Sequence, residues 1–407
     1  MERTLYGMPR FEKLEYKPIP VRELLLEMKN LSELMIDLAY SSALYDDHDL
    51  AQDVLSLESR IDTLSYLLDM EIMVAARDPK DAEDMVGILI VASATDKISD
   101  AAADIAAIVT RNISIHPIVR EIFEKVEERL MKVTVKDGSE IINQQIGDLD
   151  LAARMGVDIL AIRRNHDWIL NPDDAERIFK GDVLITRGAP MGIKEFHDMA
   201  EGQLATLPNH ELEKFQEIVN QFVELKDTSE LMIALAYSAL LLNNRELADE
   251  VERLEERVDL LHTEFEILAL KSDFKKEEAS GLLGLIRLGF ATEKIADAAA
   301  EMAEVVLRGI ETHPVLKLTI TEAEETVIQA CVTKDSQLVG KTLKEARVHE
   351  QTGMWVLTIK RGEKCLRPRP DTLIQVGDVL ITSGYADGAE DLKLLASPQM
   401  ACQPEEE

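Results

Sequence analysis

The stretch Ala94-Thr95-Asp96-Lys97-Ile98-Ser99-Asp100 recurs later in the chain as Ala291-Thr292-Glu293-Lys294-Ile295-Ala296-Asp297. Each copy sets two carboxylates four residues apart, so on a helix both project from the same face. Like charges at this spacing destabilise an isolated helix by about 0.2–0.5 kcal/mol. The repeated pair therefore indicates that something offsets the repulsion, either a bound cation or plain solvent.

Further matches extend this repeat over nearly the whole chain. Tyr40 matches Tyr237 at an offset of 197 residues, and residues 181–186 match residues 377–382 after the offset has shortened by one. Self-similarity at a fixed period is the mark of a duplicated structural unit. We interpret the chain as a tandem duplication whose two units mimic a dimer with pseudo-two-fold symmetry.

The first half of each unit has the spacing of amphipathic helices. In the first unit, apolar residues alternate steps of four and three, the stripe of helices that pack together, at Leu24, Met28, Leu31, Met35 and Leu38. We predict breaks at 46–49 and 78–79, and a helix end at His116-Pro117, because proline disfavours helix before it. In the second unit the three helices are expected at 210–242, 246–270 and 277–309. Short connections make such helices antiparallel neighbours, so each unit begins with a three-helix bundle, and a short helix follows each His-Pro pair.

The second half of each unit changes to the alternation of strands. In the first unit, strands are predicted at 129–135, 157–164, 168–170 and 183–186, with helices at 148–155 and 193–199. The order β-α-β-β-β-α describes a small α+β domain. The second unit has its copy at about 327–395.

The predicted fold class is therefore α+β, with two antiparallel three-helix bundles alternating with two small α+β domains. The predicted boundaries are an N-terminal extension at 1–20, a first bundle at 21–118, a first α+β domain at 119–203, a linker at 208–210, a second bundle at 209–316, a second α+β domain at 317–397 and an acidic tail at 398–407.

Composition excludes several classes of partner. The 407 residues contain 45 Lys and Arg against 77 Asp and Glu, a formal net charge of −32. Nucleic acids and anionic membranes reward basic surfaces, so neither is expected as a partner. No apolar run approaches the roughly 20 residues that span a bilayer, and the N-terminus lacks an apolar signal core. Three scattered cysteines suit a reducing compartment and indicate no disulfide framework. We expect a cytosolic protein.

A second carboxylate pair lies on the middle helix of each bundle. The eight acidic residues, four in each bundle, are Glu58, Asp62, Asp96, Asp100, Glu255, Asp259, Glu293 and Asp297. They flank the apolar stripes, so two packed helices could face their carboxylates toward each other, as in metal sites of helical bundles. Oxygen ligands without His or Cys favour hard cations such as Mg²⁺, Ca²⁺, Mn²⁺ or iron. The alternative is a solvated face, because acidic pairs are common in so acidic a chain.

Three antiparallel helices with Glu58-x-x-x-Asp62 on the second and Asp96-x-x-x-Asp100 on the third resemble a repeat of the PhoU family. That resemblance implies a cytoplasmic helical bundle that regulates phosphate uptake. It also implies that the eight carboxylates hold metal ions, with iron, zinc or magnesium expected. PhoU repeats follow each other directly, whereas here an α+β insert separates them.

Residues 336–343, 353–361, 368–371 and 377–381 resemble the TrkA-C domain of potassium-conductance regulators, with the likeness covering 317–397. This resemblance implies a cytosolic domain that dimerises and binds a small ligand near the dimer interface, such as a cyclic dinucleotide or a metal ion.

Candidate ligand-binding residues follow from charge and position. Lys341 beside Gly340 opens a helix, where free N–H groups favour anions. Basic residues that end the second strand of each α+β domain complete the set: Arg163, Arg164, Lys360 and Arg361. The alternative is that these are strand-end charges in solvent. No G-x-G-x-x-G follows a strand, so NAD is not expected. His116 and His313 are interpreted as helix caps.

Together these patterns indicate a non-enzymatic regulator of inorganic ion transport, with potassium or another cation favoured over phosphate. We expect a membrane transporter or channel subunit as partner and a homo-oligomeric assembly. A phosphate-uptake regulator of the PhoU type is the alternative. A metal-dependent hydrolase is the third hypothesis, which would need an open coordination position and a general base.

Overall fold

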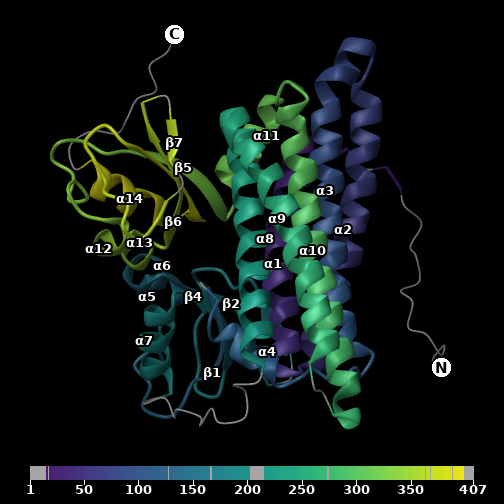
Figure 1. The fold of residues 1–407 in the computed structure, drawn as a ribbon, viewed down its shortest axis with the longest axis vertical. Coiled ribbons are helices and arrows are strands. Elements are labelled where there is room, and N and C mark those ends of the chain that lie inside the picture. Colours follow the sequence, from purple (N-terminus) through teal and green to yellow (C-terminus); the bar gives the residue numbers. More distant parts are fainter. Residues whose placement is uncertain are drawn as a thin grey trace.

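In the described part of the chain, six long helices pack together into one block, and two small sheet domains lie beside it, one above the other (Figure 1). The computed structural model describes residues 15–16, 18–126, 128–165, 167–201, 215–272, 275–362, 364–366, 368–386 and 388–397. The element order is bundle, α+β, bundle, α+β. The predicted fold class is therefore confirmed.

The first bundle contains α1 (Val21–Tyr45), α2 (His48–Ala75) and α3 (Pro79–Thr110). Asp47 caps α2 by accepting a hydrogen bond from the Leu50 N–H, and Asp78 caps α3 ahead of Pro79. A side-chain oxygen at this position satisfies a helix N–H that has no partner within the helix. These caps explain the predicted breaks.

The second bundle contains α8 (Gln216–Leu242), α9 (Arg245–Lys271), a 3₁₀ turn η2 (Lys276–Glu278) and α10 (Ala279–Leu307). Apolar residues of both bundles belong to one continuous core. The central contact is between α3 and α10, where Lys294 pairs with Asp104 at 2.8 Å and Lys97 pairs reciprocally with Glu301. These pairs are related by the sequence offset, so the bundles pack as pseudo-symmetric partners.

The third helix ends earlier than predicted. It stops at Thr110, and Asn112 adopts a left-handed conformation with φ 54°. The Ile113 N–H then bonds to the Ile108 carbonyl at 3.0 Å, which closes the helix end. The prediction that this helix reaches His116-Pro117 is wrong because an asparagine ends it first.

Short helices follow both His-Pro pairs, as predicted: α4 (Ile118–Phe123) and α11 (Pro314–Glu322). His116 Nδ1 accepts from the Ile118 N–H and His313 Nδ1 accepts from the Val315 N–H, each at 3.2 Å. The histidines therefore bond at the start of the short helix that follows each of them, and not at the end of the helix before, where caps were predicted.

Each α+β domain is a four-stranded antiparallel sheet. The first has strand order β1-β4-β2-β3 and the second β5-β8-β6-β7. Helices pack against each sheet and supply a small separate core. The elements are β1 (Arg129–Thr134), α5 (Ile146–Leu149), α6 (Leu151–Met155), β2 (Val157–Arg164), β3 (Asp167–Leu170), β4 (Val183–Gly188), α7 (Pro190–Ala200), β5 (Glu325–Cys331), α12 (Leu343–Ala346), α13 (Val348–Thr352), β6 (Met354–Arg361), β7 (Lys364–Leu366), β8 (Val379–Tyr385) and α14 (Gly388–Ala396).

The predicted helix at 148–155 is two helices. Asp150, between α5 and α6, is left-handed with φ 46°, and Arg347 takes the same place in the second domain with φ 45°. The single-helix prediction is wrong because hydrophobic spacing carries no signal for a one-residue break.

The two α+β domains touch through α6 and α13 (Figure 1). A Cβ added at Gly156 would lie 3.2 Å from the His349 carbonyl oxygen, and one at Gly353 would lie 3.4 Å from that of Ala152. Both glycines have positive φ. Backbone therefore meets backbone across this contact, where a larger residue would be strained.

Three remaining observations concern the sequence expectations. Within the described ranges, no helix is both long and apolar enough to span a membrane. Cys331 is disulfide-bonded, which three scattered cysteines did not indicate. The predicted linker at 208–210 and the acidic tail at 398–407 lie outside the described residues.

Candidate metal centres in the helical bundles

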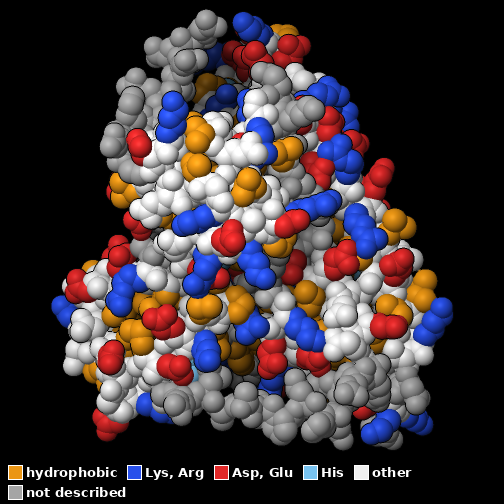
Figure 2. Space-filling view, turned by 60° about the vertical axis from the view of Figure 1, so that its left-hand side comes forward, with side chains coloured by type: hydrophobic (Ala, Val, Ile, Leu, Met, Phe, Trp, Pro, Cys, Tyr) orange, Lys and Arg blue, Asp and Glu red, His pale blue; other side chains and the backbone are white. Residues whose placement is uncertain are grey.

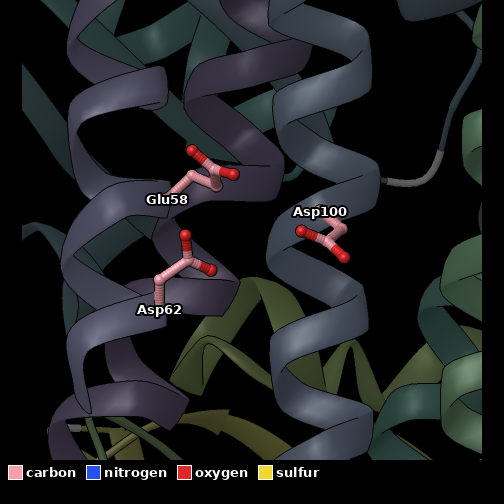
Figure 3. A group of neighbouring side chains, drawn as sticks. All are labelled: Glu58, Asp62 and Asp100. Atoms are coloured by element: carbon pink, nitrogen blue, oxygen red, sulfur yellow. The ribbon is translucent and has the colours of Figure 1, made fainter. Parts of the chain in front are cut away.

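Three carboxylates in each bundle converge between two helices. Glu58 and Asp62 project from α2 toward Asp100 on α3 (Figure 3). Each residue offers one oxygen, and these atoms all lie within 4.8 Å of one another. The second bundle repeats the group with Glu255 and Asp259 on α9 and Asp297 on α10. The i, i+4 spacing places two oxygens on one helix face, and the antiparallel neighbour supplies the third.

Asp96 and Glu293, the other two predicted ligands, lie outside these groups of three. Asp96 is half-buried, and its Oδ1 atom is buried without a hydrogen-bond partner in the described part of the chain. An unsatisfied buried oxygen needs a compensating group. The structure therefore brings three of the four predicted residues together in each bundle, with the fourth one helical turn away on the same helix.

Burial and mutual repulsion favour the protonated carboxyl groups in the first bundle. The pKa of Glu58 is raised to about 7, first by burial and then by Asp62 and Asp100. The pKa of Asp96 is raised to about 6 by burial and by Asp100. Both shifts follow from placing like charges close together in a partly desolvated groove.

The second bundle repeats this pattern. Burial, followed by Asp297 and Asp259, raises the pKa of Glu293 to about 7. Burial, followed by Asp259 and Glu301, also raises the pKa of Asp297, although His262 and Lys97 lower it in part. His262 is buried on α9, and the first unit has Ser65 in its place. The two centres are similar in charge but not identical in composition.

No Lys, Arg or His lies within ion-pairing distance of any of the six converging carboxylates among the residues that the structure describes. The nearby lysines are committed elsewhere, Lys294 to Asp104 and Lys97 to Glu301. A donor set of carboxylate oxygens, with the orphaned Asp96 Oδ1 beside it, fits a hard divalent cation. The residues present therefore fit the metal that the sequence predicted.

The predicted ligand-binding arginines have internal partners. Arg164 forms a two-pronged ion pair with Asp182 at 3.1 and 2.9 Å, and Arg361 does the same with Asp378 at 2.7 and 2.8 Å. Arg163 pairs with Asp47 at 3.2 Å and so joins the first sheet to α2. These contacts give the arginines structural roles, and ligand binding by them stays a prediction.

Gly340, Lys341 and Lys360 complete the predicted set. Gly340 has φ 78° in a turn, while Lys341 and Lys360 are exposed. None of the three lines the cavity beside Arg187 or the large cavity of the second unit. Ligand binding here also remains a prediction.

One buried charge network was missed by the sequence analysis. Arg187 on β4 is buried where both bundles and both sheets meet, and it pairs with Asp37 of α1 and with Glu325 and Tyr385 of the second domain. A cavity of about 170 Å³ beside it is lined by further charged residues of α1 and α8. Asp37 and Arg187 correspond to Ala234 and Ser383, and this paired departure from the repeat is the signal that could have identified them.

The outer face of the α+β domains carries mixed charge. Figure 2 shows Lys and Arg side chains interspersed with Asp and Glu over this face, with apolar side chains between them. Interspersed charges cancel at a distance and create no field of one sign.

Comparison with known protein families gives a match for both halves of each unit. The PhoU domain model matches residues 25–109 and 222–306, and the TrkA-C domain model matches residues 130–200 and 301–396. The chain is 30% identical over 122 residues to potassium channel protein 1 of Methanocaldococcus jannaschii, which is 29% of this chain and 36% of that protein. It is 34% identical over 79 residues to probable potassium channel protein 2 of the same organism, covering 19% and 22%. The chain thus spans about a third or less of these relatives' length.

Solved structures give weaker likenesses. The structure of PhoU from Pseudomonas aeruginosa is 16% identical, with 71% of this chain and 96% of that chain covered and a TM-score of 0.39. The structure titled GsuK channel bound to NAD is 10% identical, with 77% and 66% covered and a TM-score of 0.19.

Proposed function

Because this chain is built from alternating PhoU and TrkA-C domains, we propose that it is a regulatory protein of inorganic ion transport that binds divalent metal in its bundles. The observation that carries the proposal is the convergence of three carboxylates between two helices, repeated in both bundles. Both resemblances inferred from the sequence are confirmed by the domain matches, and the regulatory role follows from the two families together.

Potassium or another cation is favoured as the regulated ion. The two relatives described above are named as potassium channel proteins. A cytosolic location and contact with a membrane transporter or channel subunit belong to this proposal. No chemical step is assigned to the protein, since both families are regulatory.

A phosphate-uptake regulator is the second candidate, because both bundles match the PhoU model. Deletion of the gene distinguishes the two. A growth defect at limiting potassium supports the first function, whereas derepressed phosphate uptake without a potassium phenotype selects the second.

The metal would be held by Glu58, Asp62 and Asp100 in one bundle and by Glu255, Asp259 and Asp297 in the other. When bound, it would supply the positive charge that offsets their repulsion. The ligands on α3 and α10 lie on the helices that join the bundles, so ligand charge and inter-bundle packing are linked. Regulation requires that metal bind one arrangement of domains more tightly than another.

The test is elemental analysis of protein purified without chelators. We expect stoichiometric divalent metal in the native protein and its loss in the double variant Asp100→Asn, Asp297→Asn. The matched control, Glu83→Gln with Glu217→Gln, removes one exposed acid from each bundle and should keep the metal. Equal metal content in all three proteins would argue against the carboxylate centres. Failure to co-purify with a membrane transporter would count against the partner.

A further inference from the structure

A clamp fixes the first α+β domain to its own bundle. Tyr45 at the end of α1 donates to the Leu130 carbonyl at 3.2 Å and accepts from the Lys132 N–H at 2.8 Å, both on β1. The Asp47 carboxylate lies 3.0 Å from Lys132 Nζ and 3.2 Å from Arg163 Nη1. The α1–α2 turn is thereby held against β1 and β2.

The tryptophan of the neighbouring strand strengthens this clamp. Trp168 on β3 packs against the core shared by the bundles, and the Arg163 guanidinium lies 5.3 Å from its ring centroid. A cation held over an indole ring in a partly desolvated site contributes favourably to packing. In the first unit, the sheet is therefore held directly against the bundle by these contacts.

The second unit has lost every side chain of the clamp. At the offset of 197, Tyr45, Asp47, Lys132, Arg163 and Trp168 correspond to Leu242, Asn244, Gln329, Lys360 and Cys365. An asparagine and a glutamine cannot form the ion pairs that Asp47 makes in the first unit. The local helix start is nevertheless kept, because Asn244 caps α9 by accepting from the Leu247 N–H at 3.1 Å. The substitutions remove these ion pairs without removing the fold, and Val327, Leu357 and Ile381 of the second sheet still pack into the shared core.

A large cavity lies beside the start of α9, next to the turn that carries Asn244, although none of Leu242, Asn244, Gln329 and Lys360 lines it. It has a volume of about 1090 Å³ and opens between the start of α9, strand β6 and the short helices α12 and α13. This size is at the upper end of ligand sites in proteins, which span about 300–1,000 Å³. The apolar residues on its walls come from both domains and include Leu247, Leu254, Val356, Leu357 and Leu366. A ligand in it would touch bundle and sheet together.

The walls of the cavity carry charges of both signs, and two of its arginines, Arg253 and Arg347, are already paired with Glu250 and Glu350. Lys344 is part of the short helix α12 and Arg369 lies on the loop beside it, since the Lys344 N–H donates to the Pro370 carbonyl at 3.0 Å. No carboxylate lies within 4 Å of either cation in the described part of the chain. Glu246 and Asp249 line the α9 wall. An anionic group is therefore directed to the α12 side, with its apolar part against the leucines.

From these observations we infer that this cleft of the second unit binds an amphipathic organic anion, with a carboxylate, sulfonate or phosphate group at Lys344 and Arg369. The inference goes beyond the proposed function, because it depends neither on metal in the bundles nor on a transporter. A ligand here replaces the clamp of the first unit and sets how closely the second α+β domain sits on its bundle.

Tryptophan fluorescence reports on the cleft directly. The chain has two tryptophans, and Trp355 lines the cavity, stacked on His349 at 3.7 Å. The variant Trp168→Phe leaves Trp355 as the only one. We titrate this variant, as the full chain, with 1-anilinonaphthalene-8-sulfonate and separately with dodecanoate. If 1-anilinonaphthalene-8-sulfonate changes the Trp355 emission saturably, the cleft accepts a ligand with flat rings. If dodecanoate does so, the cleft accepts an acyl chain.

Two further variants localise the binding. Adding Lys344→Gln and Arg369→Gln should weaken the probe that binds by about tenfold or more, since each removes a charge-assisted contact. The control Lys334→Gln with Lys393→Gln removes two exposed cations of the same domain and should not change its affinity. Restoring the clamp with Asn244→Asp, Gln329→Lys and Lys360→Arg should close the cleft and reduce binding although both cations remain. No saturable change with either probe, or the same affinity in all these variants, overturns the inference.

Discussion

The phenol oxygen of Tyr40 in the first bundle lies 2.8 Å from Thr292 Oγ1 in the second bundle, and both residues are buried. The Thr292 hydroxyl also donates to the Leu288 carbonyl at 2.8 Å, so Tyr40 is the donor between the bundles. The bundles are therefore joined through their cores. They should behave as one cooperative unit, unlike domains linked by a wet interface.

Replacing Tyr40 tests this cooperativity. Tyr40→Phe removes one hydrogen bond and leaves Thr292 satisfied by Leu288, so we expect a loss of about 1 kcal/mol in the free energy of unfolding. Tyr40→Ala leaves a cavity and should cost about 3–5 kcal/mol. Denaturant unfolding of the helices should stay a single transition in both variants. Tyr66→Ala, at an exposed site, is the control, and separate transitions for the two bundles would contradict the shared core.

Arg187 should be the most sensitive charged residue of the fold. Arg187→Met leaves Asp37, Glu128 and Glu325 without their buried cation, and breaking such a pair costs about 3–5 kcal/mol. Adding Asp37→Ala, which copies the Ala234 of the second unit, should recover part of that loss because one orphaned charge is removed. The measurement is urea denaturation of each variant.

An exposed ion pair provides the comparison for Arg187. Arg22 pairs with Glu322 at 3.1 Å with both side chains over 40% exposed, so Arg22→Met should change stability by about 0–1 kcal/mol. Equal losses of unfolding free energy in Arg187→Met and Arg22→Met would show that the buried Arg187 network stabilises the fold no more than an exposed ion pair does.

The repeat and the periodicity of the sequence were enough to predict the architecture. Steps of four and three define helices, alternation defines strands, and an offset of 197 relates the units. Local backbone breaks were out of reach, because the left-handed conformation of Asp150 leaves no mark on hydrophobic spacing. The ending of α3 at Thr110 instead of at the His-Pro pair has the same origin.

For the candidate metal centres, sequence spacing predicted which carboxylates share a helix face. It did not predict which carboxylate oxygens lie close enough together to bind one ion. Asp96 and Asp100 are equivalent in spacing, yet only Asp100 reaches Glu58 and Asp62, since depth and rotation about α3 decide it. The Arg187 network was invisible for a different reason. Its members come from three domains, and only the packing of the units brings them together.

The carboxylate centres should make stability depend on pH and metal together. The pKa of Glu58 and of Glu293 is raised from 4.5 to about 7, so the folded, metal-free protein holds these protons more tightly than the unfolded chain. Their contribution to stability is present below pH 4.5 and is lost as the pH rises through about 7. Metal requires the ionised carboxylates, so Mn²⁺ should restore stability at pH 8 more than at pH 5.5.

Thermal melts with Mn²⁺ or with EDTA at both pH values check this. The double variant Glu58→Gln, Glu293→Gln should flatten the pH dependence of the metal-free protein, because both titrating groups are gone. An equal gain in Tm from Mn²⁺ at pH 5.5 and pH 8 would speak against proton-linked binding.

Asp96 and Asp100, the two aspartates of the repeated motif on α3, should differ in their contribution to metal binding. Asp100→Asn removes an oxygen of the converging group, whereas Asp96→Asn changes a residue outside it. We expect Asp100→Asn to lower the affinity for Mn²⁺ by tenfold or more, because it removes one charge-assisted contact to the ion. Asp96→Asn should lower the affinity by less. Calorimetry at pH 8 measures both affinities. The reverse order would mean that the ion sits deeper, at the orphaned Asp96 oxygen.

The clamp of the first unit can be undone with the residues of the second. The variant Tyr45→Leu, Asp47→Asn, Lys132→Gln, Arg163→Lys gives the first unit what the second unit has at 242, 244, 329 and 360. Asparagine still caps α2, so the helix start is kept while the bridge to β1 and β2 is lost.

Trp168 should then become more exposed, because the ion pairs that hold its strand against the bundle are gone. In a Trp355→Phe background its emission should shift to longer wavelength and be quenched more strongly by acrylamide. The control Arg60→Lys with Lys136→Gln changes exposed charges of the same unit and should leave the spectrum unchanged. An unshifted Trp168 in the four-residue variant would mean that apolar packing alone closes the first unit. The difference between the two units would then have to come from Trp168 itself, which the second unit replaces with Cys365.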